Sequence, residues 1–452
     1  MRSYVGSSSS DRQCLDDPPP DVAARELQRE NMRRQIRSDP AEFRELCARL
    51  ARWPIITDGD VQSVASYLRK GQTSVVDPDR GVSGQLLTDF QNTLGLSRRY
   101  GITFNSATNA LHAAYRAVGI GPGVKVAAIG YTFHATVTPA LDLGGDVILM
   151  DVDPTTGNLA FDVVRRTLEM NREVRAVALN HNWGVPCQDI ARIARLLKRL
   201  GVPLIEDCSH AHGASVNGES VGTHGTVSVF SLQNKKLVPA GEGGLCYTDD
   251  PGLKSAMLLV GHYSTSRESH VVQVDDSVRQ TGVGGLQCRM HPLAAALALS
   301  QLQRLSTVIR NRRLNEEFLR KLVADVPCIV FPEWPDGTHV SHYGCRAAYD
   351  PAANGGVPID QFVEVLKRLG VPVEHDLGGP LSQKAIYQRN VDSPISRFDP
   401  DRHRYTADDL PGAAEFCRRS LVFPVFSRSP LIVADMLEVI AEQIHGALSE
   451  EH

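Results

Sequence analysis

A lysine in the middle of the chain stands where imine chemistry could take place. Lys236 ends the run 230–236, and the glycine-rich run 241–244 begins shortly after it. About thirty residues upstream, the apolar run 202–205 leads to Asp207. A lysine amine can form a Schiff base with the aldehyde of pyridoxal phosphate, and a carboxylate can keep the pyridine nitrogen of that cofactor protonated. The order and spacing of the two residues favour a pyridoxal phosphate site.

Residue types alone leave simpler alternatives open. Lys235 directly precedes Lys236, and in a strand only one of two adjacent side chains can enter a site. Spacing does not choose between these lysines. A lysine can also be a solvated surface charge, and Asp207 can be an ordinary helix cap.

Other segments carry residues that could contact the same cofactor. Residues 105–111 open an alanine-rich helix, and the free amides of a helix start bind anions such as a phosphate; an ordinary Ser/Thr cap is the alternative. Phe133 could stack on the pyridine ring or lie in the core. His210 could face the cleft near the ring hydroxyl or be structural, and Ser231 is a further candidate phosphate ligand.

The elements that must position these residues alternate along the chain. Apolar, β-rich runs predict strands at 125–129, 147–152, 174–179, 203–207, 227–232 and 244–247. Helical spacing predicts helices at 108–118, 133–143, 160–170 and 189–200. This alternation is typical of an α/β fold with a mainly parallel sheet covered by helices. Ligands bind beyond the carboxyl ends of such strands, which is where Asp207 lies.

The length of 452 residues exceeds one ordinary domain. We predict an N-terminal extension over 1–52, a large domain over 53–310 and a smaller α+β domain over 311–452. The first part of the extension reads as disordered. Residues 21–52 predict two charged amphipathic helices broken at Pro40, which either dock on the body or a partner subunit or pack one face on their own domain.

Composition limits the compartment and the partners. The formal net charge of -4 gives no case for nucleic acid or an anionic membrane surface. No apolar run approaches membrane-spanning length, and no secretory signal is visible. The nine cysteines are scattered without a C-x-x-C pair, which argues against a disulfide scaffold and a structural metal site. We expect a cytoplasmic protein without a metal.

Taken together, these segments resemble the sugar and cyclitol aminotransferases of the DegT/DnrJ/EryC1/StrS family, which have the type I aspartate-aminotransferase fold. The resemblance extends roughly over residues 53–435. The matching stretches are 106–111, 131–136, 151–153, 206–214, 230–244, Arg289-Met290 with the helix that follows, and 379–381.

The resemblance implies pyridoxal phosphate as cofactor and a role for each candidate residue. Lys236 would bind the cofactor aldehyde and Asp207 the pyridine nitrogen. The remaining contacts would be stacking by Phe133, phosphate binding by the amides of Ala107 and Thr108 and by Ser231, and His210 near the ring hydroxyl. The site would be shared across a homodimer, in which the partner contributes the segment around Gln287.

The chain departs from the family pattern at three positions. The family usually has glycine where Ala107 stands, asparagine where Gln287 stands and glutamate where Pro292 stands. The run Gln233-Asn234-x-Lys236 is similar to the 2-deoxy-scyllo-inosose aminotransferases and to 3-amino-5-hydroxybenzoate synthase, which indicates antibiotic-type secondary metabolism.

We therefore predict transfer of an amino group from glutamine or glutamate to a keto-sugar or keto-cyclitol. The alternatives are a dehydratase and aromatase resembling 3-amino-5-hydroxybenzoate synthase, and a non-enzymatic partner subunit that binds the cofactor. The family's dehydratases that stop at a pyridoxamine cofactor replace the lysine with histidine, so Lys236 argues against that branch. Acceptor specificity would come from loops such as 262–285, with Asn182, Trp183, His262 and Tyr263 as possible liners.

Overall fold

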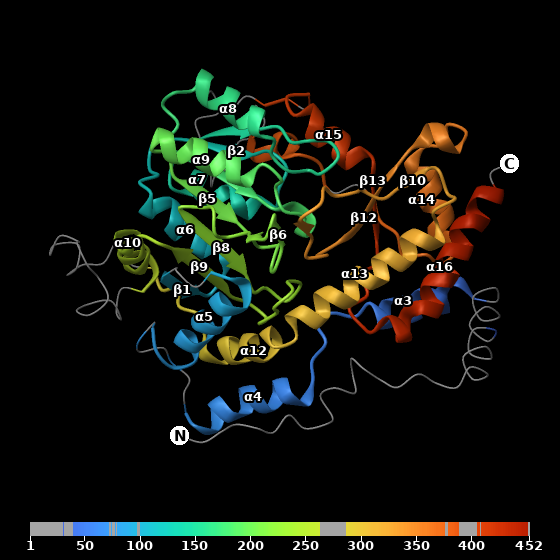
Figure 1. The fold of residues 1–452 in the computed structure, drawn as a ribbon, viewed down its shortest axis with the longest axis horizontal. Coiled ribbons are helices and arrows are strands. Elements are labelled where there is room, and N and C mark those ends of the chain that lie inside the picture. The colour runs from blue at the N-terminus through green and yellow to red at the C-terminus, as the bar shows by residue number, and fades with distance from the viewer. Residues whose placement is uncertain are drawn as a thin grey trace.

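The large domain is built on a seven-stranded sheet. The computed structural model describes residues 39–71, 79–96, 100–262, 286–375, 378–387 and 405–450 except 407, together with residues 30, 74 and 77. The strands lie in the order β1-β9-β8-β5-β4-β2-β3, and the five from β8 to β3 are parallel (Figure 1). Their bounds are β1 Tyr100–Phe104, β2 Lys125–Ile129, β3 Asp146–Met150, β4 Ala176–Asn180, β5 Leu204–Asp207, β8 Val227–Ser231 and β9 Gly244–Thr248.

Both faces of this sheet are buried. Along β8, Val229 packs in one apolar cluster while the adjacent Phe230 packs in another. Cys246 and Leu245 divide between the same two clusters along β9. Successive strand residues point to opposite faces, so continuous apolar runs are what a sheet covered on both sides requires. This confirms the predicted α/β class.

Helices lie on both sides of the sheet (Figure 1). The helices of this domain are α5 Gly81–Leu94, α6 Ala107–Ala117, α7 Thr138–Asp142, α8 Phe161–Met170, α9 Ile190–Leu200, α10 Pro251–Gly261, α12 Pro292–Leu302 and α15 Pro411–Arg418. A further helix, α4 Asp58–Arg69, packs on α12 and not on the sheet. The helix predicted at 133–143 is interrupted: a 3-10 turn, His134–Thr136, precedes α7. Pro139 explains the break, because proline fits the first turn of a helix and not its interior.

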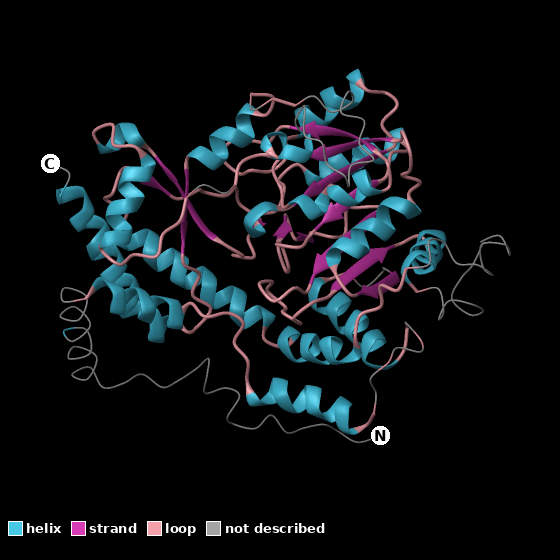
Figure 2. Cartoon of the chain, turned by 180° about the vertical axis from the view of Figure 1, so that it is seen from behind, coloured by secondary structure: helices cyan, strands magenta, loops and turns pink. Residues whose placement is uncertain are grey.

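A second, smaller body surrounds an antiparallel sheet. Its strands are β10 Ile329–Val330, β12 Cys345–Tyr349 and β13 Ser420–Phe423, and its helices are α3 Pro40–Leu50, α14 Ile359–Arg368 and α16 Pro430–Glu450. A further small sheet joins β6 Ser215–Val216, β7 Glu219–Ser220 and β11 Thr338–His339. Figure 2 shows the antiparallel sheet standing apart from the large one.

One long helix connects the two bodies. In α13 (Leu305–Leu322), Val308 packs with the large-domain cluster and Leu319 with the small-domain cluster. The boundary that we placed between residues 310 and 311 therefore falls inside a continuous helix.

The N-terminal helix α3 packs into the core of the small body. Phe43 and Cys47 are buried there beside residues of α16. The other predicted helix, before Pro40, lies outside the described residues apart from Glu30. Within the described part of the chain, no helix has the length and apolarity needed to cross a membrane.

Candidate active site

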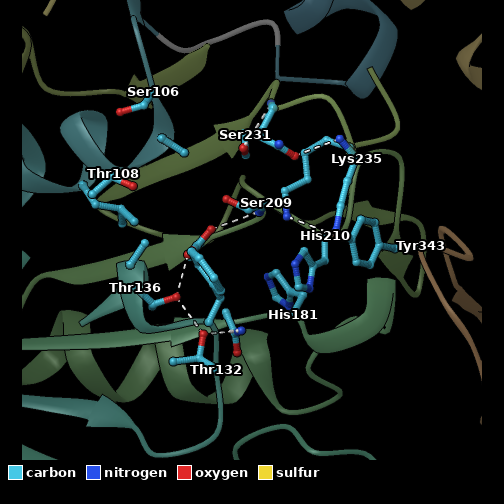
Figure 3. A pocket seen from close by; sticks show the side chains of 18 of the residues that line it. Ser106, Thr108, Thr132, Thr136, His181, Ser209, His210, Ser231, Lys235 and Tyr343 are labelled. Atoms are coloured by element: carbon cyan, nitrogen blue, oxygen red, sulfur yellow. Dashed lines mark hydrogen bonds between the residues drawn. The ribbon is translucent and has the colours of Figure 1, made fainter. Parts of the chain in front are cut away.

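A cavity of about 500 Å³ opens at the carboxyl ends of β5 and β8, beside the start of α6. It brings together all but one of the site residues predicted from the sequence, namely Ala107, Thr108, Phe133, Asp207, His210, Ser231 and Lys236. The exception is Gln287, which is exposed and forms a β-bridge with His262. Figure 3 shows the lining side chains converging from several elements.

Asp207 is held at the floor of this cavity. It is the last residue of β5 and is 5% exposed. The Thr136 hydroxyl donates to one carboxylate oxygen at 2.8 Å, and the backbone N–H of Ser209 donates to the other at 3.0 Å. Thr136 in turn contacts the hydroxyl of Thr132 at 2.7 Å (Figure 3). These bonds fix the orientation of the carboxylate in the cavity, as a partner for a pyridinium requires.

Thr132, Thr136 and Asn180 were not predicted as site residues. Asn180 ends β4, the neighbour of β5, and its amide donates to the Thr132 hydroxyl at 2.7 Å. Its place at the carboxyl end of an adjacent parallel strand is a signal that the sequence does contain.

Lys236 lies in a turn and not in a strand. Its backbone N–H donates to the carbonyl of Gln233 at 2.8 Å. Burial lowers the pKa of Lys236 to about 8; the carboxylate of Asp207 acts against this shift and Lys235 adds to it. Lys235 is exposed, yet it also lines the cavity. Because the two lysines do not continue the strand, strand alternation does not apply to them, and burial distinguishes them instead.

The N-terminus of α6 lines one end of the cavity, and this end suits an anion. Ser106 caps the helix by accepting from the N–H of Asn109, and the first-turn amides of Ala107 and Thr108 follow. A Cβ atom on Gly244 would lie 2.5 Å from the backbone nitrogen of Ala107. Glycine at this position therefore allows the helix start to approach β9 closely. The Ser231 hydroxyl lies in the same cavity, so these groups fit the phosphate of the expected cofactor.

His210 lines the cavity beside Tyr343. Its ring stacks on Tyr343 with centroids 4.0 Å apart and an interplanar angle of 9°, and its Nδ1 is buried without a hydrogen-bond partner among the described residues. Burial, with Lys236 and His212 nearby, holds the pKa of His210 well below its ordinary value, so the ring is neutral. A neutral imidazole in the cavity wall is compatible with a nearby ring hydroxyl. Phe133 is 62% exposed at the cavity wall, and its stacking on the cofactor stays a prediction.

A second cavity of about 640 Å³ adjoins the first and shares Thr132, Phe133, Trp183 and His210 with it. Trp183 has a left-handed backbone conformation with φ 57°, which is rare for a bulky residue and is often found at functional sites. Its indole N–H donates to the Tyr131 hydroxyl at 3.1 Å. Of the liners suggested for the acceptor, Asn182 and Trp183 line this cavity. His262 lines neither cavity and is buried against the Thr103 carbonyl, and Tyr263 lies outside the described residues.

Glu206, next to Asp207, has a structural role. Its carboxylate accepts from the N–H groups of Gly222 and Gly225, both at 2.6 Å, and contacts Nε2 of His181 at 3.0 Å. His181, Glu206 and Cys208 are of types that bind metals and lie close together, but these bonds already occupy the carboxylate. Burial raises the pKa of Glu206, yet the bonds from His181 and Gly222 outweigh burial and lower the pKa to about 2.

Glu206 is expected to make the protein sensitive to acid. Its pKa in the folded protein lies below the ordinary 4.5, so its stabilisation is present above about pH 4.5 and is lost as the pH falls toward 2, by on the order of 3 kcal/mol in total. Glu206→Gln should lose this dependence and be destabilised at pH 7 by about 3 kcal/mol. Urea unfolding at pH 7 and pH 3 measures both effects. Glu169→Gln, at an exposed site, is the control, and equal curves for the two variants would contradict the account.

Comparison with known proteins identifies the family. Residues 62–439 match the model of the DegT/DnrJ/EryC1/StrS aminotransferase family. The chain is 30% identical over 343 residues to L-glutamine:2-deoxy-scyllo-inosose aminotransferase of Streptomyces kanamyceticus, covering 74% of this chain and 78% of the relative. It is 27% identical over 413 residues to L-glutamine:scyllo-inosose aminotransferase of Streptomyces griseus, covering 88% and 94%.

Solved structures show the same fold. The aminotransferase TlmJ from Streptoalloteichus hindustanus superposes with a TM-score of 0.71 at 23% identity, covering 88% of this chain and 98% of that chain. The family match extends over most of the chain and agrees with the residues gathered in the cavity. This chain therefore belongs to the DegT/DnrJ/EryC1/StrS family, and it is a pyridoxal phosphate-dependent aminotransferase of fold type I.

Proposed function

We propose that this enzyme transfers the α-amino group of glutamine to a keto-cyclitol in secondary metabolism. The observation that carries the proposal is the pairing of two adjoining cavities. The first holds Lys236 and Asp207, and the second is lined by aromatic rings and polar groups. Two relatives named as glutamine:inosose aminotransferases support the choice of donor and acceptor.

The residues of the first cavity divide the chemistry between them. Pyridoxal phosphate, when bound, supplies an electron sink for the carbon atom that loses its proton. We assign its pyridine nitrogen to Asp207, and its phosphate to the amides of Ala107 and Thr108 with the Ser231 hydroxyl. The amine of Lys236 would take the proton from the substrate α-carbon as a general base and, as a general acid, would deliver it to the cofactor carbon C4′.

The second cavity suits a ring that carries hydroxyl groups. Tyr131 and Trp183 offer aromatic surface against which the C–H groups of such a ring can lie, and Thr138 and Asn182 lie beside them. Lys384 is also at this wall. An uncharged polyol ring matches a lining that combines apolar faces with a few polar groups. The same lining accepts a keto-sugar, and the acceptor assay below separates the two.

We also propose a homodimer with a shared site. Gln287 lines neither of the two cavities described above and is exposed, which leaves it accessible to a partner subunit. Pro292 begins α12, a position that proline favours. A cytoplasmic location agrees with nine cysteines that are scattered along the sequence without a C-x-x-C pair.

The lowered pKa of Lys236 predicts a pH profile. The neutral amine attacks an aldehyde, and its fraction rises with pH until the pKa of about 8 is passed. Uptake of pyridoxal phosphate by the cofactor-free protein should therefore accelerate about tenfold per pH unit up to pH 7 or so and level off above about pH 8. Stopped-flow absorption measures this rate. A rate that still rises steeply beyond pH 9 would show that the amine behaves as an ordinary lysine.

The direct test of the proposed donor and acceptor is an absorption spectrum of the cofactor-loaded protein. Glutamine should convert the band to that of the pyridoxamine form faster than glutamate, and scyllo-inosose should restore the band. Deoxy-ketosugar nucleotides should restore it slowly or not at all. A band that no donor changes would favour elimination of water and aromatisation, in which the amino donor is not consumed stoichiometrically.

A further inference from the structure

Trp53 contacts the main chain of the proposed catalytic lysine. Its indole N–H donates to the backbone carbonyl of Lys236 at 3.0 Å. The family model matches the chain from residue 62 onward, so this contact comes from a segment outside that match. Because Lys236 lies in a turn after β8 and not in the strand itself, the sheet does not fix its backbone, and an external anchor gains importance.

The indole ring of Trp53 also supports a buried arginine. The guanidinium of Arg312, on α13, lies 4.7 Å from the centre of a Trp53 ring. Arg312 is buried, and it donates to the Ser427 hydroxyl at 2.8 Å and to the carbonyls of His342 and Tyr343 at 3.2 and 3.4 Å. Burial lowers the pKa of Arg312 to about 10, which leaves it charged at neutral pH. A desolvated cation of this kind is held by the aromatic face and the carbonyls together.

Tyr343, whose backbone Arg312 holds, also contacts the side chain of Lys236. The Tyr343 hydroxyl lies 3.5 Å from Nζ of Lys236, and the same amine lies 4.8 Å from the centre of the Tyr343 ring. The same ring stacks on His210 (Figure 3). The path therefore closes: the backbone of Lys236 is held by Trp53, Trp53 supports Arg312, Arg312 holds the Tyr343 backbone, and Tyr343 contacts the amine of Lys236.

Trp53 is itself fixed on both sides. Before it, Phe43 of α3 is buried in the small-body core. After it, the Ile55 carbonyl accepts from the Gln301 amide at 3.1 Å, and Asp60 pairs with Arg304 at 2.8 Å. The segment 51–57 is thus anchored to the small body at one end and to the α12 region at the other, which restricts the position of the indole.

We infer that Trp53 is a positioning residue for Lys236 and acts together with Arg312 and Tyr343 as a clamp between the two bodies. This inference rests on the proposed role of Lys236. The clamp predicts that removing the indole N–H loosens the turn that carries the amine, although Trp53 lines neither of the two cavities.

The test is Trp53→Phe in the full-length, cofactor-loaded protein, because phenylalanine keeps a ring against Arg312 and lacks the N–H donor. The single-turnover rate with glutamine should fall about tenfold. The pH midpoint of the absorption band of the lysine-bound cofactor should move by about 0.5 or more, since the groups that surround the amine, namely Asp207, Lys235, His210, His212 and Tyr343, no longer hold the same distances from it. Thermal stability should change by less than about 3 °C.

Two further variants make the outcome decisive. Trp334→Phe makes the same substitution at a half-buried tryptophan of the small body and should leave rate and midpoint unchanged. Tyr343→Phe should move the midpoint in the same experiment. If Trp53→Phe lowers the melting temperature but leaves the rate per loaded site and the midpoint as in the wild type, Trp53 is only structural and the inference is overturned. A band that persists in Lys236→Ala would instead overturn the assignment of Lys236, and the inference with it.

Discussion

Replacing Lys236 with alanine is expected to lower the rate of amino transfer by on the order of 10⁴-fold. The substitution removes both the amine that binds the cofactor aldehyde and the base that moves the proton. The lowered pKa of about 8 is part of the reason for so large an effect, because a base works best when its pKa lies near the working pH. The rate is measured as donor-dependent single turnover at saturating pyridoxal phosphate.

Lys235→Ala is the matched control for this prediction. Lys235 lines the same cavity but is exposed, so its loss removes a nearby positive charge and no reacting group. We expect a change of less than about fivefold in rate. If Lys235→Ala abolished turnover and Lys236→Ala retained it, the two lysines would have to exchange roles.

Replacing Asp207 with asparagine is expected to reduce kcat by about 10³-fold. An amide has the shape of the carboxylate but no charge, so it does not keep a pyridine nitrogen protonated. It can accept with one oxygen only, and the bond from Thr136 or the bond from Ser209 is lost. The measurement is kcat together with the melting temperature, so that a folding defect is recognised.

Thr136→Val separates the charge of Asp207 from its placement. This variant keeps the carboxylate but removes the hydroxyl that donates to it at 2.8 Å. We expect about a tenfold loss, because the carboxylate is still charged and is held less firmly. If Thr136→Val loses as much activity as Asp207→Asn, the hydroxyl itself takes part in the reaction. If Asp207→Asn has the kcat of the wild type, Asp207 is not the partner of the pyridine nitrogen.

The central strands could be predicted closely from the sequence because their physics is local. The five residues from Lys125 to Ile129, four of them apolar, form β2 as expected, and the runs around Asp207 and Ser231 end within one residue of their predicted ends. A strand that is buried on both faces requires a continuous apolar run of this kind. Pro139 was the local signal that was overlooked when a continuous helix was predicted across 133–143.

Site residues could be predicted from the sequence only where they lie close to one another along the chain. Asp207, His210, Ser231 and Lys236 lie within thirty residues on adjacent strands and turns, so a single sheet edge collects them.

Tyr343 and Trp53 come from segments about 100 and 180 residues away from Lys236. Their contacts with Lys236 form only when the two bodies pack together. Such long-range contacts cannot be predicted from local sequence periodicity. Trp183 was named as a possible liner, but its left-handed backbone could not be read from its neighbours.

The most direct test of the central claim follows the nitrogen atom. Cofactor-loaded wild-type protein is incubated with glutamine labelled with ¹⁵N at the α-amino group and with a keto-cyclitol, and the products are analysed by mass spectrometry. The account predicts an amino-cyclitol that carries ¹⁵N, formed in equal amount to the keto acid of the donor and absent with Lys236→Ala. A dehydrated or aromatic product without donor consumption, or label that never leaves glutamine, would contradict it.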